Sequence, residues 1–218
     1  RSPSRGLGDV YKRQEQIKKE GKNKPYDCLI GLSGGVDSSF LAHLMVSEWG
    51  LRPLAVHVDA GWNSEIAVHN IEVLVRGLDI DLYTEVIDWE NMQDLQRAYM
   101  LAGVENQDVP QDHVFFSVLN RLVIKYDLKY FLTGGNASTE SILPASWGYD
   151  ATDSVNLLDI HKHFGSRKLD KYPYMSLWKR HLYFRFFANF EVARLLDLYP
   201  YFRAPAIKAV SYTHLTLP

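Results

Sequence analysis

Hydrophobic and polar positions along this 218-residue chain follow two alternating patterns. Short apolar runs, each typical of a strand, cover residues 26–32, 53–58, 82–87 and 129–132. Stretches with apolar side chains at helical spacing cover residues 38–49, 65–77, 92–102 and 113–126. Strands that alternate with helices predict an α/β fold, in which helices cover both faces of a parallel sheet of about five strands.

The pattern weakens after Asp150. Residues 153–164 are expected to form a helix, and residues 175–199, which are rich in aromatic and basic side chains, are expected to form one or two more. We therefore predict a main α/β domain over residues 15–150 and a helical C-terminal segment over residues 151–209, truncated at its end.

The two ends of the chain carry related segments. Residues 9–14 can be encoded by GAT GTG TAT AAG AGA CAG. The reverse complement of that DNA, read two bases in, encodes the Val-Ser-Tyr-Thr-His that begins at Val210. Such an inverted repeat resembles translated sequencing-library adapter, so residues 1–14 and 210–218 are expected to be adapter-derived tails and are excluded from the fold prediction. The alternative is a pair of disordered tails.

Composition narrows the class of protein. The hydrophobic fraction of 46% is enough for a packed core. No run of about 20 apolar residues occurs, so no membrane span is predicted. The net charge of -2 gives no support to nucleic-acid binding. Cys28 is the single cysteine, which excludes an internal disulfide framework within this chain and fits the reducing cytoplasm.

Candidate chemistry begins in the loop after the first apolar run. This loop reads Ser33-Gly34-Gly35-Val36-Asp37-Ser38-Ser39. Its glycines let the backbone approach an anion closely, the following helix presents free N–H groups, and the serines add hydroxyl donors. Asp37 would repel a phosphate unless a cation lay between them, so it implies Mg²⁺. The loop has no lysine, which excludes the pattern of NTPases that transfer the γ-phosphate. The alternative is a glycine-rich turn without a ligand.

This motif resembles the pyrophosphate loop of the PP-loop ATP pyrophosphatases, which share the fold of the adenine nucleotide alpha hydrolases. The resemblance implies that ATP is bound by its β- and γ-phosphates, is cleaved between the α- and β-phosphates, and transfers AMP to a substrate oxygen. It implies catalytic roles for Asp37 and Ser38. The residues that it assigns to the phosphates or the metal are Ser33, Gly34, Gly35, Asp37, Ser38 and Ser39.

A second glycine-containing segment, residues 133–140, follows the fourth run. It resembles the Gly-Thr-Gly-Asn-x-x-Glu loop that closes over ATP in amide-forming family members such as NAD synthetase. The resemblance places Gly134, Gly135 and Asn136 at the nucleotide and makes Glu140 a second Mg²⁺ ligand. The alternative is a turn and a helix N-cap, with Glu140 as an acid in the first turn.

The segment after the second run supplies further candidates. By the same resemblance, His57, Val58 and Asp59 end a strand that meets adenine and ribose. Trp62 and Asn63 are candidate contacts to the acceptor substrate. The alternatives are a packed His57, a helix-capping Asp59 and a half-exposed core aromatic at Trp62.

A longer match identifies the chain as resembling the N-acetyl sugar amidotransferases of surface-polysaccharide and flagellin-glycan biosynthesis. It covers roughly residues 26–178, and the segments that carry it are residues 55–65, 88–89, 112–113 and 134–150. It adds His113 and Trp147 as substrate candidates, for which a surface histidine and a structural turn are the alternatives. The family's cysteine-rich segment before the first strand, which is expected to bind zinc, is absent from this sequence.

The implied reaction adenylates the acetamido oxygen of a nucleotide-linked N-acetyl sugar and then replaces AMP with ammonia. Ammonia is expected from a separate glutaminase, because no cysteine-based glutaminase signature occurs here. The alternatives are an NAD-synthetase-like amide ligase, a tRNA-modifying PP-loop enzyme, and a nucleotide-binding fragment without activity.

Overall fold

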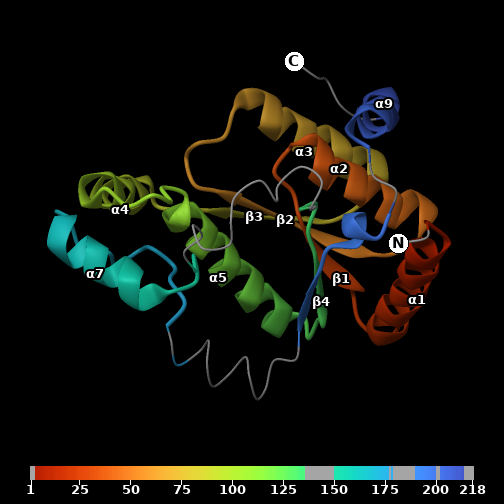
Figure 1. Ribbon diagram of the computed structural model, residues 1–218, viewed down its shortest axis with the longest axis horizontal. Coiled ribbons are helices and arrows are strands. Elements are labelled where there is room, and N and C mark those ends of the chain that lie inside the picture. Colours follow the sequence, from red (N-terminus) through yellow and green to blue (C-terminus); the bar gives the residue numbers. More distant parts are fainter. Residues whose placement is uncertain (1–2, 136–149, 177, 179–189, 200–201, 214–218) are drawn as a thin grey trace.

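The computed structural model describes residues 3–135, 150–176, 178, 190–199 and 202–213. Among them, five strands form one sheet in the order β3-β2-β1-β4-β5, and all neighbouring strands are parallel (Figure 1). The strands are β1 Cys28–Gly31, β2 Pro53–Asp59, β3 Leu82–Val86, β4 Tyr130–Leu132 and β5 Glu191–Ala193. The predicted α/β class is confirmed.

Helices cover both faces of the sheet, as expected. Along β1 the side chains alternate, so Cys28 and Ile30 pack on one face while Leu29 packs on the other. The helices on the Ile30 face are α1 Pro3–Gly21, α2 Val36–His43, α3 Glu65–Leu78 and α9 Arg203–Thr213. Those on the Leu29 face are α4 Trp89–Ala102, α5 Val109–Lys125 and α7 Ser154–Phe164. None of the helices in the described part of the chain is both long and apolar enough to cross a membrane.

Local sequence fixes the starts of the helices that border the sheet edge. The Ser64 hydroxyl accepts a hydrogen bond from the Ala67 amide (3.2 Å) and caps α3. The Asp88 carboxylate accepts one from the Asn91 amide (3.0 Å) and caps α4. Helix α2 begins after Gly35 without a side-chain cap. It runs on into a short π-helix over Leu44–Glu48.

The prediction of one or two helices over residues 175–199 is wrong for residues 191–193, while residues 177 and 179–189 lie outside the described residues. Strand β5 and the short 3₁₀-helix Leu195–Asp197 lie within residues 175–199, where helices were expected. Strand β5 pairs with β4, and the Glu191 amide also donates to the Lys129 carbonyl (2.7 Å). Three residues are too few to show a strand period, so this edge strand depends on pairing with a distant segment.

Parts of both terminal segments are included in the fold. Helix α1 begins at Pro3, and its Val10 side chain is buried. Helix α9 extends to Thr213 and buries Val210. The exclusion of these residues from the fold was therefore too wide, while their adapter origin stays a prediction about the DNA.

Candidate functional site

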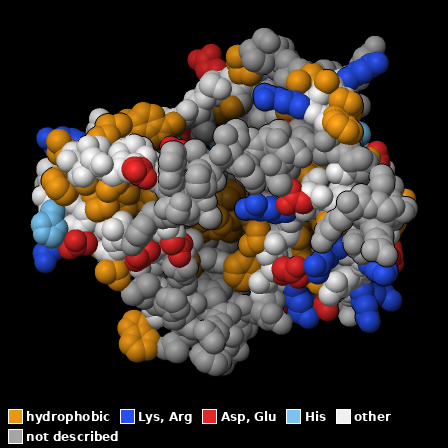
Figure 2. Space-filling view, in the orientation of Figure 1, with side chains coloured by type: hydrophobic (Ala, Val, Ile, Leu, Met, Phe, Trp, Pro, Cys, Tyr) orange, Lys and Arg blue, Asp and Glu red, His pale blue; other side chains and the backbone are white. Residues whose placement is uncertain are grey.

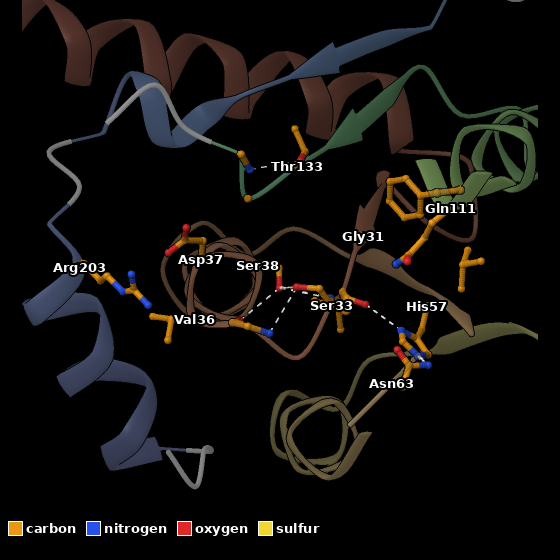
Figure 3. A pocket seen from close by; sticks show the side chains of 16 residues that line it. Gly31, Ser33, Val36, Asp37, Ser38, His57, Asn63, Gln111, Thr133 and Arg203 are labelled. Carbon is orange, nitrogen blue, oxygen red and sulfur yellow. Dashed lines mark hydrogen bonds between the residues drawn. The ribbon is translucent and has the colours of Figure 1, made fainter. Parts of the chain in front are cut away.

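A cavity of about 590 Å³ opens at the carboxyl edge of the sheet. Its walls come from the loops after β1, β2 and β4, from α5, and from the first residue of α9 (Figure 3). Parallel sheets place ligands at this edge, and small-molecule sites measure roughly 300–1,000 Å³. The cavity therefore has the position and the size of a binding site.

The loop after β1 adopts a conformation that requires glycine at position 34. Gly34 has a φ of +76°. A Cβ there would lie 2.4 Å from the Ala67 carbonyl oxygen of α3. The Asn70 amide, also on α3, donates to the Gly34 carbonyl oxygen (3.3 Å). Helix α3 thus holds the backbone of the loop from behind, and Gly34 supports the cavity without lining it.

Serine hydroxyls close the loop on itself. The Ser33 and Ser38 oxygens are 3.2 Å apart, and the Gly35 amide donates to Ser33 Oγ (3.3 Å). Ser39 donates to the Gly35 carbonyl oxygen (2.7 Å) and is fully buried. Ser33, Gly35 and Ser38 therefore line the cavity, whereas Ser39 holds the start of α2.

The loop after β4 lies directly on the first turn of α2. A Cβ at Gly134 would lie 2.6 Å from the Ser38 amide nitrogen. The Gly135 amide donates to Thr133 Oγ1 (3.2 Å), which shapes the turn. The structure thus brings both glycine-containing loops to one site, as the sequence predicts.

Three predicted residues on this side, Asn136, Glu140 and Trp147, lie outside the described residues.

His57 connects the strand ends. Its Nδ1 lies 3.0 Å from the Leu32 carbonyl oxygen, and its Nε2 lies 3.1 Å from the Asn63 amide nitrogen. A carbonyl oxygen only accepts, so Nδ1 donates the first bond and Nε2 accepts the second. His57, Val58 and Asn63 all line the cavity.

Two predicted residues of the same loop face elsewhere. Asp59 accepts a hydrogen bond from the Gly61 amide (2.9 Å) and lies outside the cavity wall. Trp62 is half-exposed, and its ring meets the ring of Trp89 edge-on, with centroids 4.9 Å apart. It lines a second cavity of about 370 Å³ beside α4.

Asp94 lines this second cavity and joins the elements around it. Its carboxylate accepts hydrogen bonds from the Ser166 amide (3.1 Å) and hydroxyl (2.5 Å), the Arg167 amide (3.1 Å) and His161 Nε2 (3.0 Å). Burial raises the pKa of Asp94, but these hydrogen bonds outweigh it and lower the pKa to about 2. Helix α4 and the end of α7 are thereby joined by a buried charge.

The predicted substrate role of His113 does not agree with its position. His113 is buried, its Nδ1 donates to the Ala151 carbonyl oxygen (2.9 Å), and its Nε2 accepts from the Met175 amide (3.1 Å). The imidazole stacks on Tyr172, with ring centroids 6.3 Å apart. These contacts attach residues 151–175 to α5, so the role of His113 is structural.

Three cavity residues lie outside the loops and strand ends where the site was predicted: Gln111 and Phe115 of α5, and Arg203 of α9. Gln111 and Phe115 are one turn apart on the same helix face. The Phe115 ring presses on β1, since a Cβ at Gly31 would lie 2.7 Å from it. Sequence spacing predicted a helix from residue 113, which includes Phe115 but not Gln111, and it could not show which side of that helix faced a cavity.

The helix beside the cavity also carries an unusual acid. Burial, with a smaller effect from repulsion by Asp108, raises the pKa of Asp112 to about 6. Asp112 adjoins Gln111 but is not part of the cavity wall.

Among the described lining residues, Asp37 is the one carboxylate. No group of three or more His, Cys, Asp or Glu in the described part of the chain could hold a metal alone. Mg²⁺ commonly takes one or two carboxylates and completes its shell with water and substrate phosphates. A single Asp37 therefore fits Mg²⁺ that arrives with a phosphate, and Glu140, the predicted second ligand, lies outside the described residues.

Comparison with known proteins gives similarity of fold. No family model and no curated protein matches the sequence. Similar solved structures include an NH3-dependent NAD synthetase from Campylobacter jejuni, 16% identical over 72% of each chain, with a TM-score of 0.47. An NMN synthetase from Francisella tularensis is 16% identical over 100% of this chain and 98% of its own, with a TM-score of 0.46. A glutamine-dependent NAD+ synthetase from Acinetobacter baumannii is 19% identical over 71% of this chain and 31% of its own, with a TM-score of 0.49. At these identities the similarity is one of fold alone.

Proposed function

We propose that this chain binds Mg-ATP in the larger cavity and transfers AMP to an acceptor, with release of pyrophosphate. One observation carries the proposal: the uncapped start of α2, with its two-glycine loop, opens into a nucleotide-sized cavity at the carboxyl edge of the sheet. The backbone amides of a helix's first turn and the positive end of its dipole favour an anion there. The sequence resemblance to the PP-loop ATP pyrophosphatases makes that anion the β- and γ-phosphates of ATP.

Each wall of the cavity suits one part of ATP. Ser33 and Ser38 offer hydroxyls beside the α2 amides, and Gly134 lies close enough to exclude water from that side. The end of β2 at His57 and Val58 would meet the ribose and adenine. Mg²⁺, when bound through Asp37, would neutralise charge on the phosphates.

We propose that the acceptor is a nucleotide-linked N-acetyl sugar. Trp62 and Asn63 are consecutive, yet one lines the second cavity and the other lines the nucleotide cavity. An acceptor on the Trp62 indole would therefore lie beside ATP. Large aromatic faces with a few polar neighbours suit the apolar side of a sugar ring.

The chemistry needs little from side-chain acids and bases. The acetamido oxygen forms a bond to the α-phosphorus while the bond to the β-phosphate oxygen breaks, and pyrophosphate leaves with the electron pair. Ammonia then adds to the activated carbon and loses a proton, the carbon–oxygen bond breaks, and AMP leaves. The product is an acetamidino sugar.

Ammonia would come from a separate glutaminase. Cys28 is fully buried in β1, and burial, with a smaller effect from Asp27, raises the pKa of its thiol well above the usual range. Such a thiol is a poor nucleophile at neutral pH. With ATP and glutamine as inputs, we place the reaction in the cytoplasm.

Product analysis tests the proposal. The chain would be incubated with ATP, Mg²⁺, ammonium and a nucleotide-linked N-acetyl sugar, and the nucleotides would be separated by chromatography. AMP and pyrophosphate are expected, while ADP and phosphate would reject the mechanism. AMP release with deamido-NAD or tRNA, and none with the sugar, would replace the acceptor by that of an amide ligase or a tRNA-modifying enzyme.

A pair of variants tests the site. Asp37→Asn should abolish turnover, because it removes the one described carboxylate of the cavity wall. Asp59→Asn is the matched control, because Asp59 holds a turn outside that wall. Equal activities of the two variants would remove Asp37 from the site.

A further inference from the structure

Arg203 lies at the mouth of the larger cavity, beside Val36 and Asp37 (Figure 3). Among the described residues of the cavity wall, it is the one lysine or arginine. The loop itself has no lysine. Any positively charged side chain that meets a phosphate here must therefore come from another part of the chain.

Buried residues on α9 fix the position of Arg203. Ala206 and Val210 are both buried and belong to the same core cluster as Phe40 and Leu41 of α2. They follow Arg203 at i+3 and i+7, so the three side chains share one face of α9. Arg203 is nevertheless exposed. Its side chain is thus open to solvent and also lines the cavity.

Arg203 forms no ion pair with any carboxylate in the described part of the chain. Other arginines do form such pairs, for example Arg52 with Asp27 (2.6 Å) and Arg121 with Glu85 (2.6 Å). On the face shown in Figure 2, several lysine and arginine side chains lie next to acidic ones. An arginine that lines a cavity without an ion pair can direct its donors toward whatever fills that cavity.

We infer that Arg203 binds the terminal phosphates of the nucleotide, as the positive group that the serine and glycine loop lacks. A guanidinium offers a planar fork of donors that matches two phosphate oxygens. The first turn of α2 would contact the phosphates from one side and Arg203 from the solvent side. This inference rests on the proposed function, since it needs ATP in the larger cavity.

Calorimetric titration of the full chain with Mg-ATP, Mg-pyrophosphate and AMP tests the inference. Arg203→Ala should weaken binding of Mg-ATP and pyrophosphate by about 10-fold or more, which is the usual loss for one charge-assisted hydrogen bond. Binding of AMP should not change, because AMP lacks the terminal phosphates. Arg203→Lys keeps the charge without the fork and should give intermediate affinities.

Lys208→Ala is the matched control. Lys208 is an exposed cation on the same helix, five residues further on and outside the cavity wall. The Lys208→Ala variant should bind Mg-ATP, Mg-pyrophosphate and AMP with the affinities of the wild-type chain. Three results would refute the assignment: Arg203→Ala binds Mg-ATP with wild-type affinity, its affinity for AMP falls as much as its affinity for Mg-ATP, or Lys208→Ala shows the same fall in affinity.

The same titration separates the two proposals. If the wild-type chain binds neither Mg-ATP nor pyrophosphate, the proposed function fails and the role of Arg203 fails with it. If Arg203→Ala shows the selective loss while product analysis gives ADP, the role of Arg203 stands and AMP transfer is rejected.

Discussion

Replacement of Gly34 by alanine tests whether α3 and the β1–α2 loop form one packed unit. Two costs are expected. Alanine at a φ of +76° costs about 1–2 kcal/mol, because the left-handed region brings Cβ close to the backbone. The added Cβ would also lie 2.4 Å from the Ala67 carbonyl oxygen, and overpacking of this kind costs about 1–3 kcal/mol. Together they predict a loss of about 2–5 kcal/mol in the free energy of unfolding.

Two other glycines separate these costs. Gly103 has a φ of +65°, and a Cβ there would have no atom within 4 Å, so Gly103→Ala should show only the conformational cost. Gly134 has no such φ, but a Cβ there would lie 2.6 Å from the Ser38 amide, so Gly134→Ala should show only the steric cost. Urea denaturation would measure stability, and titration with Mg-ATP would measure binding.

Binding should fall in Gly34→Ala and Gly134→Ala and stay unchanged in Gly103→Ala. If Gly34→Ala is no less stable than Gly103→Ala and binds Mg-ATP normally, the claim that α3 sets the loop is refuted.

Three further predictions concern the acids and the acceptor. The pKa of Asp112 rises from 3.8 to about 6 on folding, so its stabilising effect is complete below pH 3.8 and is lost as the pH rises through 6. The free energy of unfolding of Asp112→Asn should therefore rise by up to about 3 kcal/mol relative to that of the wild-type chain between pH 4 and pH 7.5. Curves of unfolding free energy against pH that stayed parallel for the two proteins would contradict this. The pKa of Asp94 falls from 3.8 to about 2, so its contribution of about 2–3 kcal/mol is present above pH 3.8 and is lost as the pH falls through 2. Asp94→Asn should lack that acid dependence, and chemical denaturation across this pH range would show whether it does. Trp62→Ala should raise KM for the nucleotide-linked sugar and leave KM for ATP unchanged; steady-state kinetics that gave equal rises would place Trp62 outside the acceptor site.

Local signals account for the parts of the fold that the sequence predicted. Strands β1 and β2 are apolar runs that end in polar loops, and the structure places them within two residues of the predicted ranges. The glycines and serines of residues 33–39 carry their conformational preferences with them. Such features do not depend on distant residues, so they could be predicted from the local sequence.

The parts that failed depend on contacts between distant segments. His113 was predicted to contact the substrate, with a surface histidine as the alternative, but residues 151–175 pack over it and bury it. Arg203 follows a segment with no clear pattern, and only the burial of Ala206 against the α2 region places it at the cavity. Periodicity identifies a helix and its apolar face, but not the element against which that face packs.

Two neighbouring serines show how packing assigns different tasks to similar residues. The Ser39 hydroxyl donates to the Gly35 carbonyl oxygen at 2.7 Å and is fully buried, so a ligand could recruit it only by opening α2. The Ser38 hydroxyl makes longer contacts, 3.2 Å to Ser33 and 3.3 Å to Gly35, and it lines the cavity. A phosphate that replaced these two long hydrogen bonds with one charge-assisted bond would gain free energy, because such bonds are shorter and about twice as strong. If the proposed phosphate binds here, the loop needs little reorganisation, because Ser39 already holds the start of α2 and only Ser38 has to exchange its hydrogen-bond partners.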